Sequence, residues 1–134
     1  MKRIVDLLEV PVLPADWIAR RPRHLNDAIE ILVRHCVDGS PKESEFVANH
    51  CRFTFVRKLM PTVGYWISKN WWTGELSDYL EARGVVMADD AAELILRGTH
   101  DRLTCGSYSE AGLVEETKDY WRGLGVPDGI PKLV

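Results

Sequence analysis

The sequence predicts an all-α fold, in which one compact domain is built from about five to six short helices. A length of 134 residues is typical of a single domain that buries its core without metals or disulfides. The composition, 46% hydrophobic and 28% charged, is that of an ordinary globular protein. Apolar residues recur at helical spacing, and strand-like alternation is marginal and confined to residues 4–12. We therefore expect an N-terminal arm at 1–16, a helical core at 22–122 and a C-terminal tail at 123–134.

The first elements are the arm and one helix. Pro11 and Pro14 disfavour a long helix near the N-terminus, so a short helix or an extended arm that packs on the body is expected there. From Leu25 onward, apolar side chains return every three or four residues, as on the buried stripe of a helix. These residues are Leu25, Ala28, Ile29, Leu32, Val33 and Cys36. The dipeptide at 38–39, Asp-Gly, ends this helix.

A second helix has the clearest start. Residues 40–43, Ser-Pro-Lys-Glu, combine a capping box with proline at the first helical position. Its expected buried stripe consists of Phe46, Val47, Cys51, Thr54, Phe55 and Leu59. Pro61 is expected to end this helix after Met60, and the apolar spacing predicts a separate helix over 62–70.

Glycines delimit the following short helix. The dipeptide at 73–74, Thr-Gly, is a break, and a helix begins at Glu75. Gly84 stands where a helix end needs a left-handed residue. In the helix over 62–70 and in the helix that begins at Glu75, the residues expected to face inward are Val63, Trp66, Ile67, Leu76, Tyr79 and Leu80.

Two further helices complete the core. Asp89 and Asp90 are expected to cap the first of them, because their oxygens and charge suit the free N–H groups of a first turn. The last helix begins near Ser109 and is closed by Gly123 or Gly125. The expected inward residues of the two helices are Leu94, Ile95, Leu103, Leu113, Val114, Tyr120 and Trp121.

The central region also carries a recognisable set of residues. Its most specific members are Gly64, Ile67, Asn70, Trp71, Gly84, Asp89 and Asp90. In this arrangement, residues 63–106 resemble the core of a small family of uncharacterised bacterial and bacteriophage proteins, a domain of unknown function whose pattern is Leu-Gly-x-x-Ile-Arg-Asn-x-Trp followed by Gly-Ile-x-x-x-Asp-Asp. An earlier match at Pro22, Leu25, Ala28 and Ile29 extends the resemblance to residues 22–106.

The chain departs from that pattern at two places. Met60 stands where the family tends to have histidine before the Leu-Gly step, and Ser68-Lys69 stands where it has Arg-Asn. A site shared through those polar residues would be altered here. The resemblance implies a helical fold and a possible bacteriophage origin, and it implies no reaction.

Charge gives limited information on partners. The net charge of −3 argues against a general nucleic-acid binder. Residues 1–60 carry ten Lys/Arg and eight Asp/Glu, whereas residues 61–134 carry seven and twelve. Two small basic clusters supply candidates for binding an anionic group, although solvated side chains are the simpler interpretation. These candidates are Arg20, Arg23, Arg52, Arg57 and Lys58.

Metal and catalytic motifs are weak. The possible zinc donors are His35, Cys36, His50, Cys51, His100 and Cys105. Adjacent helical residues point about 100° apart, so the two His-Cys pairs chelate poorly, and the three cysteines are expected to be free thiols. No Walker loop, G-x-G-x-x-G, H-E-x-x-H or G-x-S-x-G motif is present. We expect no metal, no cofactor and no catalytic residue.

Aromatic residues give the best functional indication. Three of the five tryptophans, Trp66, Trp71 and Trp72, lie within seven positions. Two adjacent tryptophans at a helix end cannot both face one interior, so one of them is a candidate interface anchor, with core packing as the alternative. The proposed interface consists of Trp71, Trp72, Lys69 and Asn70.

These observations favour a non-enzymatic protein that binds another protein, such as a bacteriophage factor that acts on a host protein. The alternative is a small-ligand or nucleotide-binding protein or enzyme that uses the basic clusters, and a nucleic-acid binder is a third possibility. Exposed aromatic residues would allow a homodimer. No segment is apolar enough to span a bilayer and no signal peptide is evident, so a cytoplasmic protein is expected.

Overall fold

The structure is a computed structural model that describes residues 21–37 and 41–132. Within those residues all regular structure is helical, which confirms the all-α prediction. The helices are α2 (Leu25–Val37), α3 (Pro41–Ala48), α4 (Arg52–Leu59), α5 (Tyr65–Asn70), α6 (Gly74–Glu81), α7 (Ala88–Cys105) and α8 (Glu110–Gly123), with a π-helical turn η2 (Met60–Gly64). The expected arm at 1–16 and the capping residue Ser40 lie outside the described residues. In the part of the chain that is described, no helix combines the length and apolar character needed to cross a bilayer.

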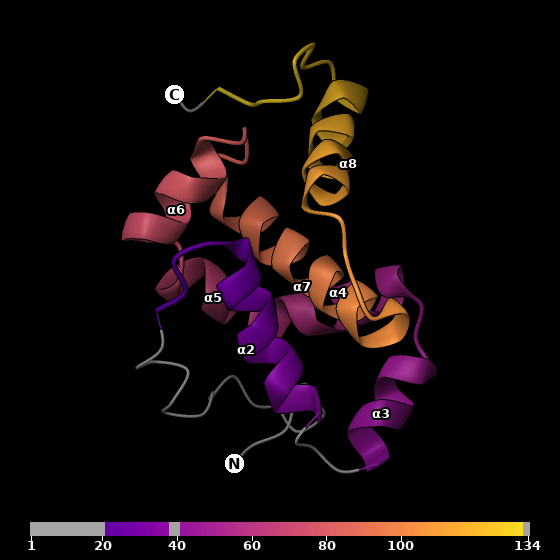
Figure 1. The fold of residues 1–134 in the computed structure, drawn as a ribbon. Helices are drawn as coiled ribbons and strands as arrows, with labels where there is room; N and C mark the ends of the chain where they lie inside the picture. The colour runs from indigo at the N-terminus through magenta and orange to yellow at the C-terminus, as the bar shows by residue number, and fades with distance from the viewer. Residues whose placement is uncertain (1–20, 38–40, 133–134) are drawn as a thin grey trace.

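Helix α7 forms the centre of the domain (Figure 1). It packs against α2, α3, α4, η2, α5 and α8. Buried residues lie on most sides of this helix: Ala91, Ala92, Leu94, Ile95, Leu96, Gly98, Thr99 and His100. A helix with so wide a buried face must be covered by several other elements, which is why the short helices assemble around it. The largest fully buried side chains of the core are Phe55, Leu25, Ile29, Leu32, Leu59, Ile67, Leu76, Leu80 and Leu94.

The expected helix over residues 41–60 is in fact two helices. Cys51 has an extended backbone (φ −66°, ψ 164°) and separates α3 from α4. The His50 ring donates from Nδ1 to the carbonyl of Phe46 at 2.7 Å, and His100 Nε2 lies 2.8 Å from the His50 carbonyl. Side chains therefore satisfy carbonyl groups that a continuous helix would use. As a result Cys51 is exposed, and its assignment to the core was wrong.

The expected break at Pro61 does not occur. Proline lacks the N–H that an α-helix would use, and η2 absorbs this loss by widening the helix for one turn. The Tyr65 N–H donates to the carbonyl of Met60, five residues back, and the chain continues into α5. Residues 52–70 thus run as one helical stretch.

The predicted starts of the last two helices, α7 and α8, agree with the structure only in part. Helix α8 begins where expected, and Ser109 caps it through a hydrogen bond from the Gly112 N–H at 3.0 Å. The cap of α7 is Met87, which makes no side-chain cap bond, so the assignment of Asp89 and Asp90 as caps was wrong. Both aspartates lie in the first turn of α7, where their charge still suits the helix dipole.

The chain reverses at two left-handed glycines. Gly84 (φ +93°) follows α6 and Gly125 (φ +96°) follows α8. The next residue in each case donates its N–H back to a carbonyl in the last turn of the helix, Val85 to Leu80 and Val126 to Trp121. After Gly125 the chain turns back from α8 toward α6 (Figure 1). Near its end, Ile130 packs against Gly84. Tyr120, expected in the core, is 61% exposed, so that expectation was also wrong.

Candidate functional site

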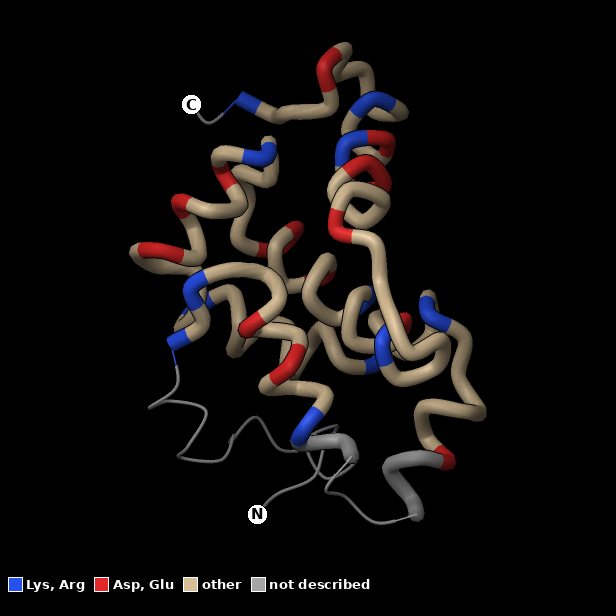
Figure 2. The backbone as a smooth tube through the Cα atoms, in the orientation of Figure 1, with Lys and Arg blue, Asp and Glu red and all other residues tan. Residues whose placement is uncertain are grey.

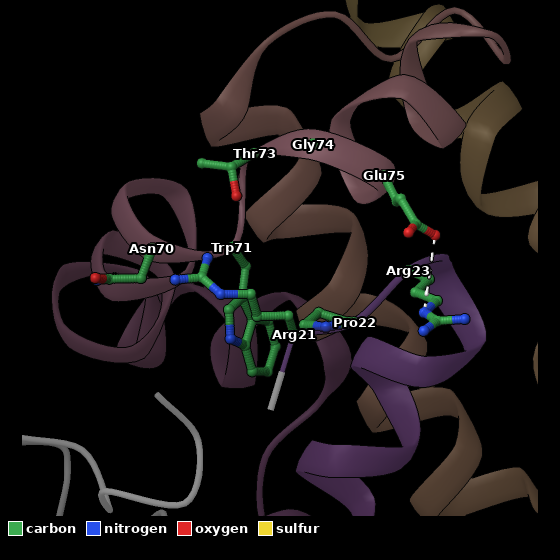
Figure 3. A pocket seen from close by; sticks show the side chains of 8 residues that line it. All are labelled: Arg21, Pro22, Arg23, Asn70, Trp71, Thr73, Gly74 and Glu75. Carbon is green, nitrogen blue, oxygen red and sulfur yellow. Dashed lines mark ion pairs between the residues drawn. The ribbon is translucent and has the colours of Figure 1, made fainter. Parts of the chain in front are cut away.

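A pocket of about 560 Å³ lies between the residues that precede α2 and the turn that joins α5 to α6. We call it the tryptophan-turn pocket. It is lined by Arg21, Pro22, Arg23, Asn70, Trp71, Thr73, Gly74 and Glu75 (Figure 3). Two segments about fifty residues apart in the sequence therefore form one concave surface.

Trp71 forms the apolar base of this pocket. Its side chain is only 3% exposed, and its ring packs edge-on against Trp66 at 5.5 Å between centroids. It lies at the end of α5, where its backbone N–H donates to the Ile67 carbonyl at 2.9 Å. Burial of the ring holds the turn at the end of α5 against the core.

Polar groups form the rest of the wall. Arg23 lies 3.8 Å from Glu75, and both side chains are more than two-thirds exposed (Figure 3). The N-terminal turn of α6 also borders the pocket, and the cap residue Thr73 makes no side-chain cap bond there. Gly74 has φ +54°, with open space where a Cβ would stand. The first backbone N–H groups of a helix have no partner within the helix, and the Thr73 side chain does not bind those of α6.

The four expected interface residues have different environments. Trp71 belongs to the core, and Trp72 is half-buried against it. Lys69 and Asn70 are exposed: the Lys69 ammonium lies 5.5 Å from the centroid of the Tyr65 ring, and the Asn70 amide donates to the Trp66 carbonyl at 3.0 Å. Only Trp72, Lys69 and Asn70 offer accessible surface.

The expected anion-binding residues do not gather at one place. Arg20 lies outside the described residues, and Arg23 lines the tryptophan-turn pocket. Arg52 and Arg57 line a second concavity of about 480 Å³ between α4, η2, α7 and α8, which we call the α4–α7 groove. Lys58 is exposed, with its Nζ 3.1 Å from His50 Nε2. Along the backbone, basic and acidic residues are interspersed (Figure 2).

Arg52 is committed to ion pairs within the protein. Its guanidinium donates to Asp101 at 3.1 Å and to both oxygens of Glu116. Although burial opposes the charge, the hydrogen bond with Glu116 and the nearby carboxylates raise the pKa of Arg52 above its usual value. Arg97 donates to the same Glu116 at 3.0 Å and to the Thr117 hydroxyl at 2.7 Å. This network joins α4, α7 and α8.

Of the nine residues that line the α4–α7 groove, sequence reasoning named only Arg52 and Arg57 as site candidates; Phe53, Arg97 and Glu116 are among those it missed. Phe53 is 71% exposed and lies off the helical stripe that contains Phe55, which is the signal that could have identified it. Arg97 and Glu116 carry no such signal, because their pairing arises only when α7 meets α8.

The cysteine and histidine side chains that the structure describes form no metal-binding cluster. Among residues whose positions are described, no three His, Cys, Asp or Glu side chains are close enough to share a metal ion. Cys51 and Cys105 are exposed free thiols. Hydrogen bonds from the Thr54 side chain and backbone lower the pKa of the Cys51 thiol.

Comparison with known proteins bears on the family alone. No curated protein and no solved structure is significantly similar to the chain. The family model of a domain of unknown function, DUF6794, matches residues 21–103. That range runs from the residues before α2 into the last turn of α7, and it contains every residue that lines the tryptophan-turn pocket. The chain therefore belongs to the DUF6794 family.

Proposed function

We propose that this chain is a non-enzymatic domain that binds a segment of another protein in the tryptophan-turn pocket. The observation that carries the proposal is the meeting of Arg21 and Arg23 with the turn at residues 70–75 around one pocket of about 560 Å³. An aromatic base with arginines and exposed backbone N–H groups at the rim is typical of protein-binding surfaces.

The side chains around the pocket favour binding over catalysis. Its described lining contains no histidine or cysteine, and its one carboxylate, Glu75, is exposed and near Arg23. Acid–base or nucleophilic chemistry needs a positioned base or an activated nucleophile. A partner's carboxylate or backbone carbonyl groups would instead bind the two arginines and the first turn of α6, while Trp72 and Lys69 contact the partner at the rim.

The nature of the partner is a finer part of the proposal. The resemblance of residues 22–106 to bacterial and bacteriophage proteins supports a phage-encoded factor that acts on a host protein in the cytoplasm. A second copy of the chain is the competing partner, and it would appear as a homodimer in the experiment below.

The test is to obstruct the pocket without disturbing the core. Thr73 is exposed, extended (φ −148°) and makes no side-chain cap bond, so Thr73→Arg places a long side chain at the entrance with little effect on folding. Ser107→Arg, at an exposed position between α7 and α8, is the matched control. Both variants are expected to melt within about 3 °C of the wild type, since surface substitutions change stability by less than about 0.5 kcal/mol.

The readout is affinity purification from host cells, followed by calorimetry with the purified partner. We expect the wild type and Ser107→Arg to bind the same partner, and Thr73→Arg to bind it at least about tenfold more weakly, which is 1.4 kcal/mol. Equal binding by all three proteins would exclude the pocket as the docking site. A wild type that captures no partner and does not self-associate would contradict the proposed function itself.

A further inference from the structure

The α4–α7 groove has the size and the apolar wall of a small-ligand site. Its volume of about 480 Å³ lies within the range of about 300–1,000 Å³ that small-molecule pockets occupy. One wall consists of Phe53, Val56, Met60 and Pro61. Phe53 is 71% exposed, so the groove presents an aromatic ring that no described element covers.

The π-helical turn shapes this wall. Met60 and Pro61 are its first two residues, and the widened turn brings both to the groove. Gly64 provides the space for Met60: a Cβ at Gly64 would stand 2.5 Å from the Met60 sulfur. The thioether is therefore seated against the glycine. A methyl group there would displace a side chain that lines the groove.

The opposite wall is charged, and most of its charge is already paired. Arg52 and Arg97 both bind Glu116. The second carboxylate of the lining, Glu93, lies 3.9 Å from the Arg97 Nε. That Nε atom is buried and has no hydrogen-bond acceptor among the residues that the structure describes. Each of the two carboxylates in the groove, Glu93 and Glu116, therefore lies within ion-pair distance of an arginine.

Arg57 differs from the other two arginines. It lines the groove from the last turn of α4 and is exposed. Its guanidinium takes part in no ion pair or hydrogen bond with any residue that the structure describes. A ligand can pair with this cation without displacing an internal carboxylate.

From this arrangement we infer that the α4–α7 groove binds a small amphipathic carboxylic acid. The carboxylate pairs with Arg57, and the apolar body lies along Val56 and Met60 and beneath Phe53. This site is separate from the tryptophan-turn pocket and does not depend on the function proposed there. An apolar body with a carboxylate at one end matches both the exposed Phe53 ring and the Arg57 guanidinium, which has no partner among the described residues.

The experiment is a titration of the full chain with decanoate, followed by calorimetry and by amide chemical shifts. Decanol is the neutral analogue with the same chain length. We expect saturable decanoate binding, amide shifts concentrated in α4 and η2, and binding of decanol that is weaker by about threefold to fivefold, the effect of one exposed ion pair.

Two pairs of variants assign the contacts. Arg57→Gln is expected to reduce decanoate affinity by about threefold to fivefold while leaving decanol binding unchanged. Arg34→Gln, at an exposed arginine of α2, is its control and leaves both affinities unchanged. Phe53→Ser is expected to weaken both ligands, whereas Tyr120→Ser, at a residue 61% exposed on α8, weakens neither. All four positions are exposed, so melting curves should match the wild type.

Absence of saturable decanoate binding to the wild type would overturn the inference. Decanol binding as tight as decanoate binding, or an Arg57→Gln variant with unchanged decanoate affinity, would overturn the role of the cation. Thr73→Arg should leave decanoate binding intact and Arg57→Gln should leave partner capture intact. Failure of one site is therefore distinguishable from failure of the other.

Discussion

Gly98 shows how one residue can control the packing of three helices. It lies near the middle of α7, where glycine is intrinsically unfavourable by roughly 1 kcal/mol relative to alanine. A Cβ at this position would stand 2.4 Å from Ile29 Cδ1 and 3.1 Å from Leu113 Cδ1. Helices α2 and α8 therefore approach α7 at a point where a methyl group would overlap the end of the Ile29 side chain and press against that of Leu113.

Replacement of this glycine should be costly. We expect Gly98→Ala to lower the free energy of unfolding by up to about 2 kcal/mol, because shifting the packed neighbours costs about 1–3 kcal/mol and the better helix propensity of alanine returns about 1 kcal/mol. Gly123→Ala is the control: no atom lies within 4 Å of a Cβ there, and its effect should stay within about 1 kcal/mol. Urea denaturation measures both. Equal effects of the two substitutions would contradict the proposed packing role.

Single residues also account for the errors in the sequence analysis. Cys51 fits a helical stripe by spacing, yet it is exposed because the His50 and His100 side chains bind carbonyl groups near the helix break. Trp71 and Trp72 are indistinguishable in the sequence. Their different burial follows from the end of α5, which turns one ring into the core and leaves the other at its edge.

In the first turn of helix α7, opposing electrostatic effects act on the carboxyl group of Asp90. Asp90 accepts a hydrogen bond from the Trp121 indole at 2.7 Å, which links α7 to α8. Burial raises the pKa of Asp90 above its usual value, although the Trp121 hydrogen bond acts in the opposite direction. Because the folded-state pKa exceeds the unfolded one, ionisation of Asp90 costs stability above these pKa values. That cost disappears as the pH falls below both.

This sign gives a pH-dependent prediction for Asp90→Asn. The amide oxygen can still accept from Trp121, and the variant has no carboxylate to ionise, so its melting temperature relative to the wild type should be higher at pH 7 than at pH 3. Asp89→Asn is the control, because Asp89 is exposed and should lose only its dipole interaction, about 0.3–1 kcal/mol at pH 7. Thermal melts at the two pH values decide. A relative melting temperature for Asp90→Asn that rises on acidification would contradict the sign.

Some helix boundaries are set by nearby residues, and others by tertiary packing. The starts of α2 and α8 and the left-handed Gly84 were predicted, because the periodicity, the Ser109 cap and the glycine requirement are encoded within a few residues. The α3–α4 break and the η2 turn were not. Pro61 disfavours an α-helix because it lacks a backbone N–H. A π-helical turn accommodates the missing N–H, and packing of η2 and α5 on α7 keeps the chain helical beyond it.

In the folded molecule, ion pairs connect the more basic first part of the sequence with the acidic second part. Arg52, from the more basic first sixty residues, binds Asp101 and Glu116 in the acidic remainder. Arg97 shares Glu116 and is only 11% exposed. Glu116 is thus the carboxylate that two guanidiniums share where α4, α7 and α8 meet.

We expect Glu116→Gln to lower the free energy of unfolding by about 1–3 kcal/mol, because it leaves the buried Arg97 without its hydrogen-bonded counter-charge. The neighbouring Glu115→Gln removes an exposed pair with Arg122 and should cost less than about 1 kcal/mol. Urea denaturation at low and high salt distinguishes them, since added salt should reduce only the smaller effect substantially. If the two variants were equally stable, the network would have no role in joining the helices.

The sequence by itself determined the all-α class and most of the buried residues, because helical periodicity and local caps act over a few residues. It also contains the segment, residues 21–103, that the family model of a domain of unknown function matches. The tertiary structure decided which tryptophan is buried, which arginines are paired and where the two concavities lie. Those features join residues 21–23 to 70–75, and α4 to α7 and α8. Contacts of that range depend on how the helices pack, which no local pattern specifies.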